Sequence, residues 1–146
     1  EGDISFGKEV QLGYFPSPYF YSGDIHLEAR TKNSKIEFGT SVFVNNNFTA
    51  ISVAKISIGN HVLIGTNVEI VDSDFHAVNP KKRFGGKAES KEVVISENVW
   101  LGNNVKILKG VCIGKNTVIA NGSIVSSDIP ENVVAGGVPA KVIKQL

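Results

Sequence analysis

Residues 95–124 read ISENVW LGNNVK ILKGVC IGKNTV IANGSI, a run of six-residue steps in which every step begins with an aliphatic residue. The fifth place of each step is β-branched or small, as at Val99 and Ser123. The same pattern occupies residues 58–70. Weaker versions of it begin at Phe6, Leu12, Phe38 and Val44. A fixed period held over most of a chain is the signature of a solenoid.

Each step predicts a short strand followed by a corner, because β-branched residues dominate and glycines recur in every window. Three steps make one coil with three flat faces, so the first-place aliphatic residues stack on one another in the interior. Asparagines at the corners, such as Asn67 and Asn98, tolerate positive φ and suit tight bends. The sequence therefore predicts an all-β parallel β-helix, one domain over residues 1–146, with about seven coils.

Composition limits the class of protein. The chain has 146 residues, enough for one domain, and its 42% hydrophobic content suffices for a core without metal or disulfides. A net charge of +1, from 15 basic and 14 acidic residues, argues against nucleic-acid binding. The single cysteine, Cys112, follows a core valine; it cannot form an internal disulfide and is expected to be structural.

The sequence has no run of about 18 apolar residues, so no membrane span is expected. Its first residues do not resemble a secretory signal. The chain begins at Glu1 and contains no methionine, so targeting information that precedes Glu1 would be lost. The expected location is the cytoplasm.

The repeat breaks once, after Ile70. Ile95, the next in-frame residue, lies 37 positions after Ile58, one more than six full steps. Between them, proline, adjacent glycines and clustered charge predict a loop of about residues 77–92 extruded at a corner, with His76 at its base. Five basic residues, Arg83 among them, against two acidic ones give the loop a charge of +3. Such a loop is either simply solvated or a flap that attracts an anionic ligand.

The sequence on either side of the break resembles the hexapeptide-repeat O-acetyltransferases, such as the galactoside, maltose and polysaccharide enzymes. The resemblance rests on residues 72–76 (DSDFH), 95–102 (ISENVWLG) and 129–144 (IPENVVAGGVPAKVIK). It implies a left-handed coil, against the general rule that about 98% of parallel crossovers are right-handed. It also implies a homotrimer with sites at the subunit interfaces, acetyl-CoA as co-substrate, a carbohydrate acceptor and no metal.

The resemblance gives His76 the role of general base on an acceptor hydroxyl, although a lone histidine is more often structural. A histidine is mostly neutral at pH 7, and such a base contributes about 10² to 10⁴ in rate. The backbone N–H of Asn103 matches a donor to the thioester oxygen, where it would stabilise the developing oxyanion.

Other residues match the cofactor side of the family's site. Trp100, the only tryptophan, is expected to be partly exposed and to line the acetyl-CoA cleft; a subunit contact is the alternative. Lys141 and Lys144 match positions that contact CoA phosphates, although a solvated terminus explains them equally well. Asn121 and Ser126 are further expected cofactor contacts.

The acceptor side is less regular. Asn45 matches a family asparagine near the acyl group and the acceptor, or else belongs to a plain corner run. Asp72 and Asp74 are expected to orient His76, to bind a sugar hydroxyl or only to face water. A family aspartate is replaced by Val53, which argues against copying galactoside specificity.

Three other functions are compatible with this fold. A γ-type carbonic anhydrase needs three zinc-binding histidines, two of them five residues apart, whereas His26, His61 and His76 are separated by 35 and 15. A non-catalytic solenoid that serves assembly is a second alternative. The third is N-acetylation of an amino sugar, which the sequence does not distinguish from O-acetylation.

Overall fold

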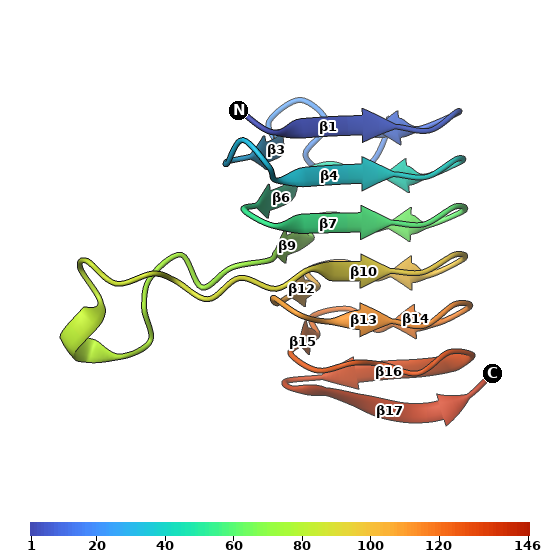
Figure 1. The fold of residues 1–146 in the computed structure, drawn as a ribbon. Helices are drawn as coiled ribbons and strands as arrows, with labels where there is room; N and C mark the ends of the chain where they lie inside the picture. The colour runs from blue at the N-terminus through green and yellow to red at the C-terminus, as the bar shows by residue number, and fades with distance from the viewer.

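Every third step of the repeat returns the chain to the same face of a triangular prism (Figure 1). The computed structural model describes all residues, 1–146, and the chain winds as the predicted left-handed parallel β-helix. The first sheet contains, in spatial order, β1 (Asp3–Phe6), β4 (Lys35–Phe38), β7 (Lys55–Ile58), β10 (Val93–Ile95) and β13 (Cys112–Ile113). The second contains β2 (Gln11–Leu12), β5 (Phe43–Val44), β8 (Leu63–Ile64), β11 (Trp100–Leu101), β14 (Val118–Ile119), β16 (Val133–Gly137) and β17 (Ala140–Gln145). The third contains β3 (Ile25–Ala29), β6 (Phe48–Ser52), β9 (Glu69–Val71), β12 (Lys106–Ile107) and β15 (Ile124–Val125).

The coil length changes along the prism. Ile95 lies opposite Ile113, 18 residues further on, as three six-residue steps require. In an earlier coil Phe38 lies opposite Ile58, 20 residues further on. The two additional residues lie at the corner between β6 and β7. The first and third sheets have five strands each, fewer than the predicted coils, because irregular corner segments consume part of the chain.

The core follows the six-residue pattern. All first-place aliphatic residues from Ile58 to Val125 are buried, and so are the fifth-place residues from Val62 to Ile129 except Asp74, where the repeat breaks. Second-place glycines occupy positions where neighbouring coils touch: a Cβ on Gly65 would lie 2.7 Å from the backbone nitrogen of Asn103. Successive side chains of a strand point to opposite sides. The residue just before each first-place residue therefore points outward, onto a face of the prism.

Corner asparagines act in two ways, only one of which was predicted. Asn67 and Asn98 adopt positive φ, as expected. Asn60 and Asn121 are not among the residues with positive φ; their side-chain oxygens accept hydrogen bonds from backbone N–H groups of the adjacent coil.

An irregular segment, residues 13–24, leaves the prism between β2 and β3. The side chain of Asn46, 4% exposed, holds it through bonds to both backbone groups of Tyr14 and to the carbonyls of Ser17 and Pro18. This anchoring places Tyr14 beside the outer face of the second sheet.

The predicted loop projects from the corner between β9 and β10, on the left in Figure 1. We call this edge of the prism the loop corner. The loop includes the short 3-10 helix η1 (Pro80–Lys82). The side chain of Asn79, just before this helix, accepts a hydrogen bond from Lys81 N–H. No helix in the structure is long and apolar enough to cross a membrane.

Candidate active site

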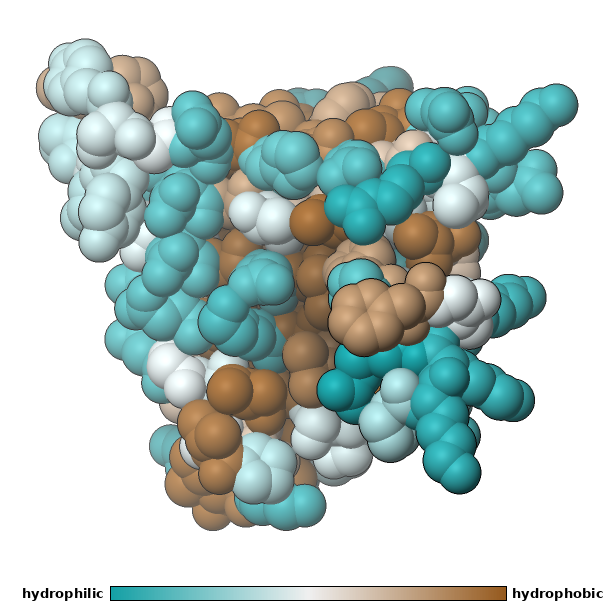
Figure 2. All heavy atoms as spheres, turned by 90° about the vertical axis from the view of Figure 1, so that its left-hand side faces the viewer, coloured by the Kyte–Doolittle hydropathy of each residue, from teal (hydrophilic) through white to brown (hydrophobic).

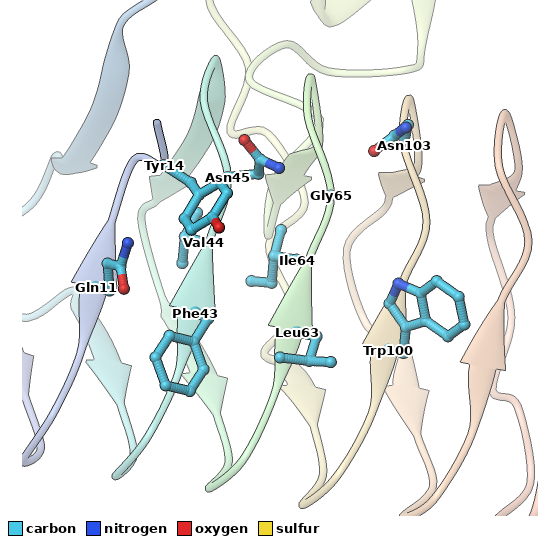
Figure 3. Close-up of a pocket in the computed structure, with 10 residues that line it drawn as sticks. All are labelled: Gln11, Tyr14, Phe43, Val44, Asn45, Leu63, Ile64, Gly65, Trp100 and Asn103. Atoms are coloured by element: carbon cyan, nitrogen blue, oxygen red, sulfur yellow. The ribbon is translucent and has the colours of Figure 1, made fainter. Parts of the chain in front are cut away.

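A cavity of about 480 Å³ opens on the outer face of the second sheet (Figure 3). Its floor is a cross-strand row of Gln11, Phe43, Leu63 and Trp100, which lie opposite one another on β2, β5, β8 and β11. The other lining residues are Tyr14, Val44, Asn45, Ile64, Gly65 and Asn103. The cavity ends at the edge where the chain turns from the second sheet to the third, which we call the pocket corner.

Trp100 is 53% exposed and stands on the outer face of β11, as the sequence predicted. Its neighbours in the row are Leu63 on one side and Val118 on the other. The indole therefore forms one end of a largely apolar trough, with amide groups along the pocket corner.

The structure brings Asn45 and Asn103 to the same cavity. The Asn45 side-chain oxygen accepts a bond from Asn46 N–H, at 2.7 Å, and the Asn103 side-chain oxygen accepts one from Thr66 N–H, at 2.9 Å. Neither amide nitrogen (Nδ2) has a hydrogen-bond partner within the chain, so both remain available as donors.

The backbone N–H of Asn103 does not have the freedom that the sequence-based prediction assumed. It donates a 2.8 Å hydrogen bond to Oδ1 of Asn121, which lies one coil further on. Because an N–H that is already bonded is not free to receive a developing oxyanion, the predicted role of this group is not supported. Asn121 instead contributes by fixing the turn that carries Asn103.

The two C-terminal lysines lie on the same sheet as Trp100. A continuous row of paired residues leads from Trp100 through Val118 and Val134 to Lys144. Lys141 lies nearby on β17, opposite Gly136. At about 4.8 Å per strand, Lys144 is about 14 Å along the row from Trp100.

At the loop corner, a short two-stranded stem carries the loop. Ser73 and Ser90 form an antiparallel bridge. Asp74 N–H donates to the carbonyl of Glu89, at 3.0 Å, and Lys91 N–H donates to the carbonyl of Asp72, at 2.9 Å. The two sides of the loop's base are therefore bonded to each other.

Asp72 is fully buried and does not face a ligand. Its carboxylate accepts hydrogen bonds from the hydroxyl of Ser52 and the backbone N–H groups of Val53 and Ala54, at 2.6–2.9 Å. Val53 and Ala54 are the two additional residues at the corner between β6 and β7, and Asp72 accepts hydrogen bonds from both of their N–H groups. The expectation that Asp72 binds a sugar hydroxyl is therefore wrong, because the side chain is committed to holding the corner.

Asp74 and Arg83 also contact the protein itself. Lys109 Nζ lies 3.4 Å from Asp74 Oδ2 and 3.1 Å from Glu89 Oε2, so it joins the two sides of the stem. The hydrogen bond to Glu89 and the charge of Asp74 raise the pKa of Lys109. Arg83 donates to the carbonyl of Val78, at 3.1 Å, which braces the loop.

His76 is exposed and its side chain forms no hydrogen bond or ion pair within the chain. It follows Phe75, which has a positive φ of 60°, and precedes Ala77, which is buried. The imidazole is therefore free to contact a ligand, while the residues on either side hold its backbone.

His76 and the cavity lie on different edges of the prism. The cavity ends at the pocket corner, between the second and third sheets, whereas His76 stands at the loop corner, between the third and first. Ser126 follows β15 at the loop-corner end of the third sheet, so it does not lie with Trp100. One chain therefore brings Trp100, Asn45, Asn103 and Asn121 together but leaves His76 apart from them.

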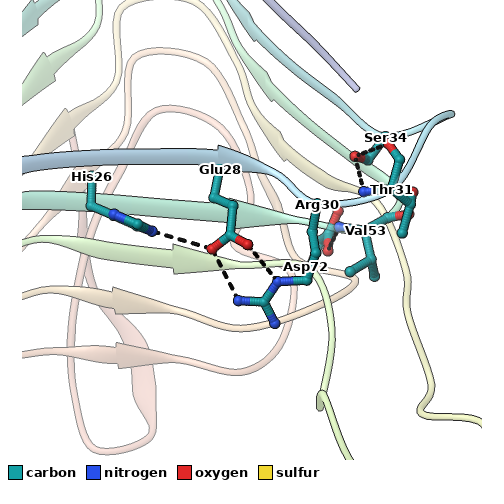
Figure 4. A network of polar contacts seen from close by, with 7 residues as sticks. All are labelled: His26, Glu28, Arg30, Thr31, Ser34, Val53 and Asp72. Carbon is teal, nitrogen blue, oxygen red and sulfur yellow. Dashed lines mark hydrogen bonds and ion pairs between the residues drawn. The ribbon is translucent and has the colours of Figure 1, made fainter. Parts of the chain in front are cut away.

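Sequence analysis missed a charged network beside the loop corner (Figure 4). His26, Glu28 and Arg30 alternate along one side of β3 and its end, and Glu28 pairs with both others. Their i, i+2, i+4 spacing on a predicted strand was the available signal. The contact of Arg30 with Phe75, 45 residues later, left no such signal.

The fold is that of the left-handed β-helix transferases. Residues 92–127 match the family model described as bacterial transferase hexapeptide (six repeats). The chain is 43% identical over 139 residues to a galactoside O-acetyltransferase of Lactococcus lactis, covering 95% of this chain and 63% of that protein. It is 33% identical to a putative lipopolysaccharide biosynthesis O-acetyl transferase of Escherichia coli, covering 99% of this chain and 73% of that protein.

A solved structure is also similar. A hexapeptide-repeat-containing acetyltransferase of Vibrio cholerae, complexed with acetyl coenzyme A, superposes with a TM-score of 0.81 at 32% identity, covering 97% of this chain and 70% of that one. The chain belongs to the hexapeptide-repeat O-acetyltransferase family, as its sequence motifs predicted. It spans less than two thirds of the length of the Lactococcus relative. No group of three or more His, Cys, Asp or Glu side chains is placed to hold a metal ion.

Proposed function

We propose that this protein transfers an acetyl group from acetyl-CoA to a carbohydrate hydroxyl, with His76 as the general base. The observation that carries the proposal is the row of paired residues from Trp100 to Lys144 on the second sheet. It joins an apolar cavity bordered by amides to a lysine near the end of the chain. The acetyl-CoA-bound relative from Vibrio cholerae and the galactoside O-acetyltransferase from Lactococcus lactis support this choice of donor and acceptor.

In this proposal acetyl-CoA lies along the second sheet. The pantetheine arm is a slender chain of alternating apolar and amide segments, which matches the trough beside Trp100. The distance of about 14 Å to Lys144 suits an extended arm that ends in phosphates. Lys144 and Lys141 would then contact the phosphates by charge-assisted hydrogen bonds.

The reaction needs no covalent enzyme intermediate. Neutral His76 accepts the proton of the acceptor hydroxyl as the hydroxyl oxygen attacks the thioester carbon. A tetrahedral oxyanion forms and then collapses, which breaks the carbon–sulfur bond, and the imidazolium returns its proton to the departing CoA thiolate. The products are an acetyl ester and free CoA, and His76 is neutral again.

The oxyanion requires hydrogen-bond donors close to the thioester. The Nδ2 groups of Asn45 and Asn103, the Tyr14 hydroxyl and the Trp100 indole N–H are all unpaired donors at the cavity. We assign this role to the two carboxamides rather than to the backbone of Asn103, whose N–H is already bonded. Preorganised donors of this kind stabilise the transition state because they need no reorientation during the reaction.

Because His76 and the cavity lie on different corners, we propose that each complete site combines the cavity of one copy with His76 of another, in a homotrimer. The side of the prism from which the loop projects supports this packing, since hydrophobic side chains run down its middle between hydrophilic ones (Figure 2). On the third sheet, Ile51 and Val71 pair with each other, and both are apolar and half-buried.

The experiment is an acetyl-transfer assay on the purified protein with acetyl-CoA and a panel of galactosides, glucosides and amino sugars. Release of the CoA thiol and mass spectrometry of the sugar would identify the product. We expect an added acetyl group that dilute alkali removes, as an ester. An alkali-stable amide would indicate the N-acetyltransferase alternative, and neither binding nor transfer would favour a non-catalytic assembly module.

A further inference from the structure

The side chain of Arg30 is held by two contacts of different kinds. Its Nε and Nη2 atoms donate to the two carboxylate oxygens of Glu28, at 2.8 and 3.0 Å, and His26 Nε2 lies 3.2 Å from the same carboxylate (Figure 4). Its guanidinium carbon lies 4.7 Å from the centre of the Phe75 ring. The bidentate fork fixes the guanidinium plane, so the cation is presented to the ring in one orientation.

Phe75 adopts a backbone conformation that a bulky residue rarely takes. Its φ is 60°, in the left-handed region, where most residues other than glycine, asparagine and aspartate are disfavoured. Its N–H donates to Oγ of Ser73, at 3.1 Å. The attraction between the Arg30 cation and the aromatic ring offsets part of the conformational cost, because the contact exists only while Phe75 holds this conformation.

This conformation matters because His76 has no support of its own. The imidazole forms no hydrogen bond within the chain, so its direction depends on the backbone of the residues beside it. Ala77, on the other side, is buried and therefore also fixed. Phe75 is thus the residue through which the prism can control where His76 points.

We propose that Arg30 is a positioning residue for His76, acting through the ring of Phe75. The inference rests on the proposed function of His76 as general base. Without the Arg30 contact, Phe75 would sample other backbone conformations and His76 would spend less time in reach of the acceptor hydroxyl. The expected effect is a lower kcat, because correct alignment of reacting groups is lost, with unchanged affinity for acetyl-CoA, which binds at the other corner.

The hydrogen bonds from Arg30 and His26 lower the pKa of Glu28 to about 2. A lowered pKa means that the ion pair is complete above the ordinary carboxyl range and is lost only as the pH falls towards 2. Above about pH 5 Glu28 is therefore ionised and its ion pair with Arg30 is complete.

The test compares Arg30→Ala, Arg30→Lys and Phe75→Leu, using acetyl-CoA and whichever galactoside, glucoside or amino sugar of the panel the wild type acetylates fastest, with detection of the CoA thiol. We expect Arg30→Ala to lower kcat about three- to tenfold, in line with a partly exposed cation–π contact. Arg30→Lys should restore part of the loss, since it keeps a cation but not the fork. The matched control is Lys115→Ala. Lys115 lies between β13 and β14 and forms an exposed ion pair with Glu131, so its replacement should leave kcat unchanged.

The double variant Arg30→Ala/Phe75→Leu separates positioning from general destabilisation. If Arg30 acts through Phe75, the double variant loses little more kcat than Phe75→Leu alone. Additive losses, or an unchanged kcat with only a lower Tm in Arg30→Ala, would overturn the proposal. If the wild type transfers no acetyl group, or if His76→Asn is as active as the wild type, the proposed function fails instead.

Discussion

Trp100 and Lys144 stand in one cross-strand row on the outer face of the second sheet, joined through Val118 and Val134. The row begins in the apolar cavity and ends in a cation, as the proposed acetyl-CoA site requires for the acyl end and the phosphates of its ligand. The spacing follows from the strand repeat, because β14 and β16 each lie one coil further on and β17 pairs antiparallel with β16.

This row predicts separable effects on acetyl-CoA binding. Trp100→Ala should raise the Kd about tenfold, because it removes a large aromatic contact. Lys144→Ala should raise it about three- to tenfold, with a smaller effect at high salt, because it removes a charge that contacts phosphate. Calorimetric titration measures both.

S-acetylpantetheine, which lacks the nucleotide phosphates, provides the control. Lys144→Ala should not change its affinity, whereas Trp100→Ala should weaken it. An equal effect of Lys144→Ala on both ligands would mean that this lysine supports the sheet rather than the phosphates.

The separation of His76 from the cavity predicts complementation between inactive copies. His76→Asn and Asn45→Ala should each be nearly inactive alone, since each lacks one half of the site. After mixing, unfolding and refolding together, random assortment should restore about a quarter of the wild-type activity, because each shared site then has one chance in four of holding both intact halves. Refolded mixtures that stay inactive would mean that one chain supplies the whole site.

The bond between Asn103 N–H and Asn121 Oδ1 allows the oxyanion donor to be identified. Asn45→Ala should lower kcat about 10²-fold, the usual loss for one such donor. Asn121→Ala frees the backbone N–H of Asn103 and should not raise kcat. A higher kcat in Asn121→Ala would return the oxyanion role to that backbone group, as the family resemblance implied.

Asp72 predicts an effect on stability rather than on binding. Asp72→Ala leaves the hydroxyl of buried Ser52 and the N–H groups of half-buried Val53 and Ala54 without partners, which should lower the free energy of unfolding by about 3 kcal/mol. Urea denaturation measures this change, with the exposed Glu131→Ala as control. A variant of normal stability that binds acceptor poorly would restore the ligand-binding role to Asp72.

The six-residue period was sufficient to predict the parallel coils and their core, because it controls burial along the prism, whereas the left hand of the coil was implied by the family resemblance. The period also located the loop and His76, since a repeat shows its interruptions plainly. The sequence did not distinguish Asp72 from Asp74. Asp72 is buried because its carboxylate accepts hydrogen bonds at the irregular corner between β6 and β7, and no sequence pattern reveals that contact. Two contacts depend on which coils become neighbours: the hydrogen bond from Asn103 to Asn121, and the stacking of Arg30 on Phe75. Residue identity alone does not reveal either contact.

The most direct test of the account is the turnover of His76→Asn at saturating acetyl-CoA, beside His61→Asn. His61 is an exposed corner histidine with a positive φ of 57°, a conformation that asparagine tolerates, so its replacement is a matched control. The account predicts a fall in kcat of about 10²- to 10⁴-fold for His76→Asn, with normal acetyl-CoA affinity, and no change for His61→Asn. Near-normal acetyl transfer by His76→Asn would contradict it.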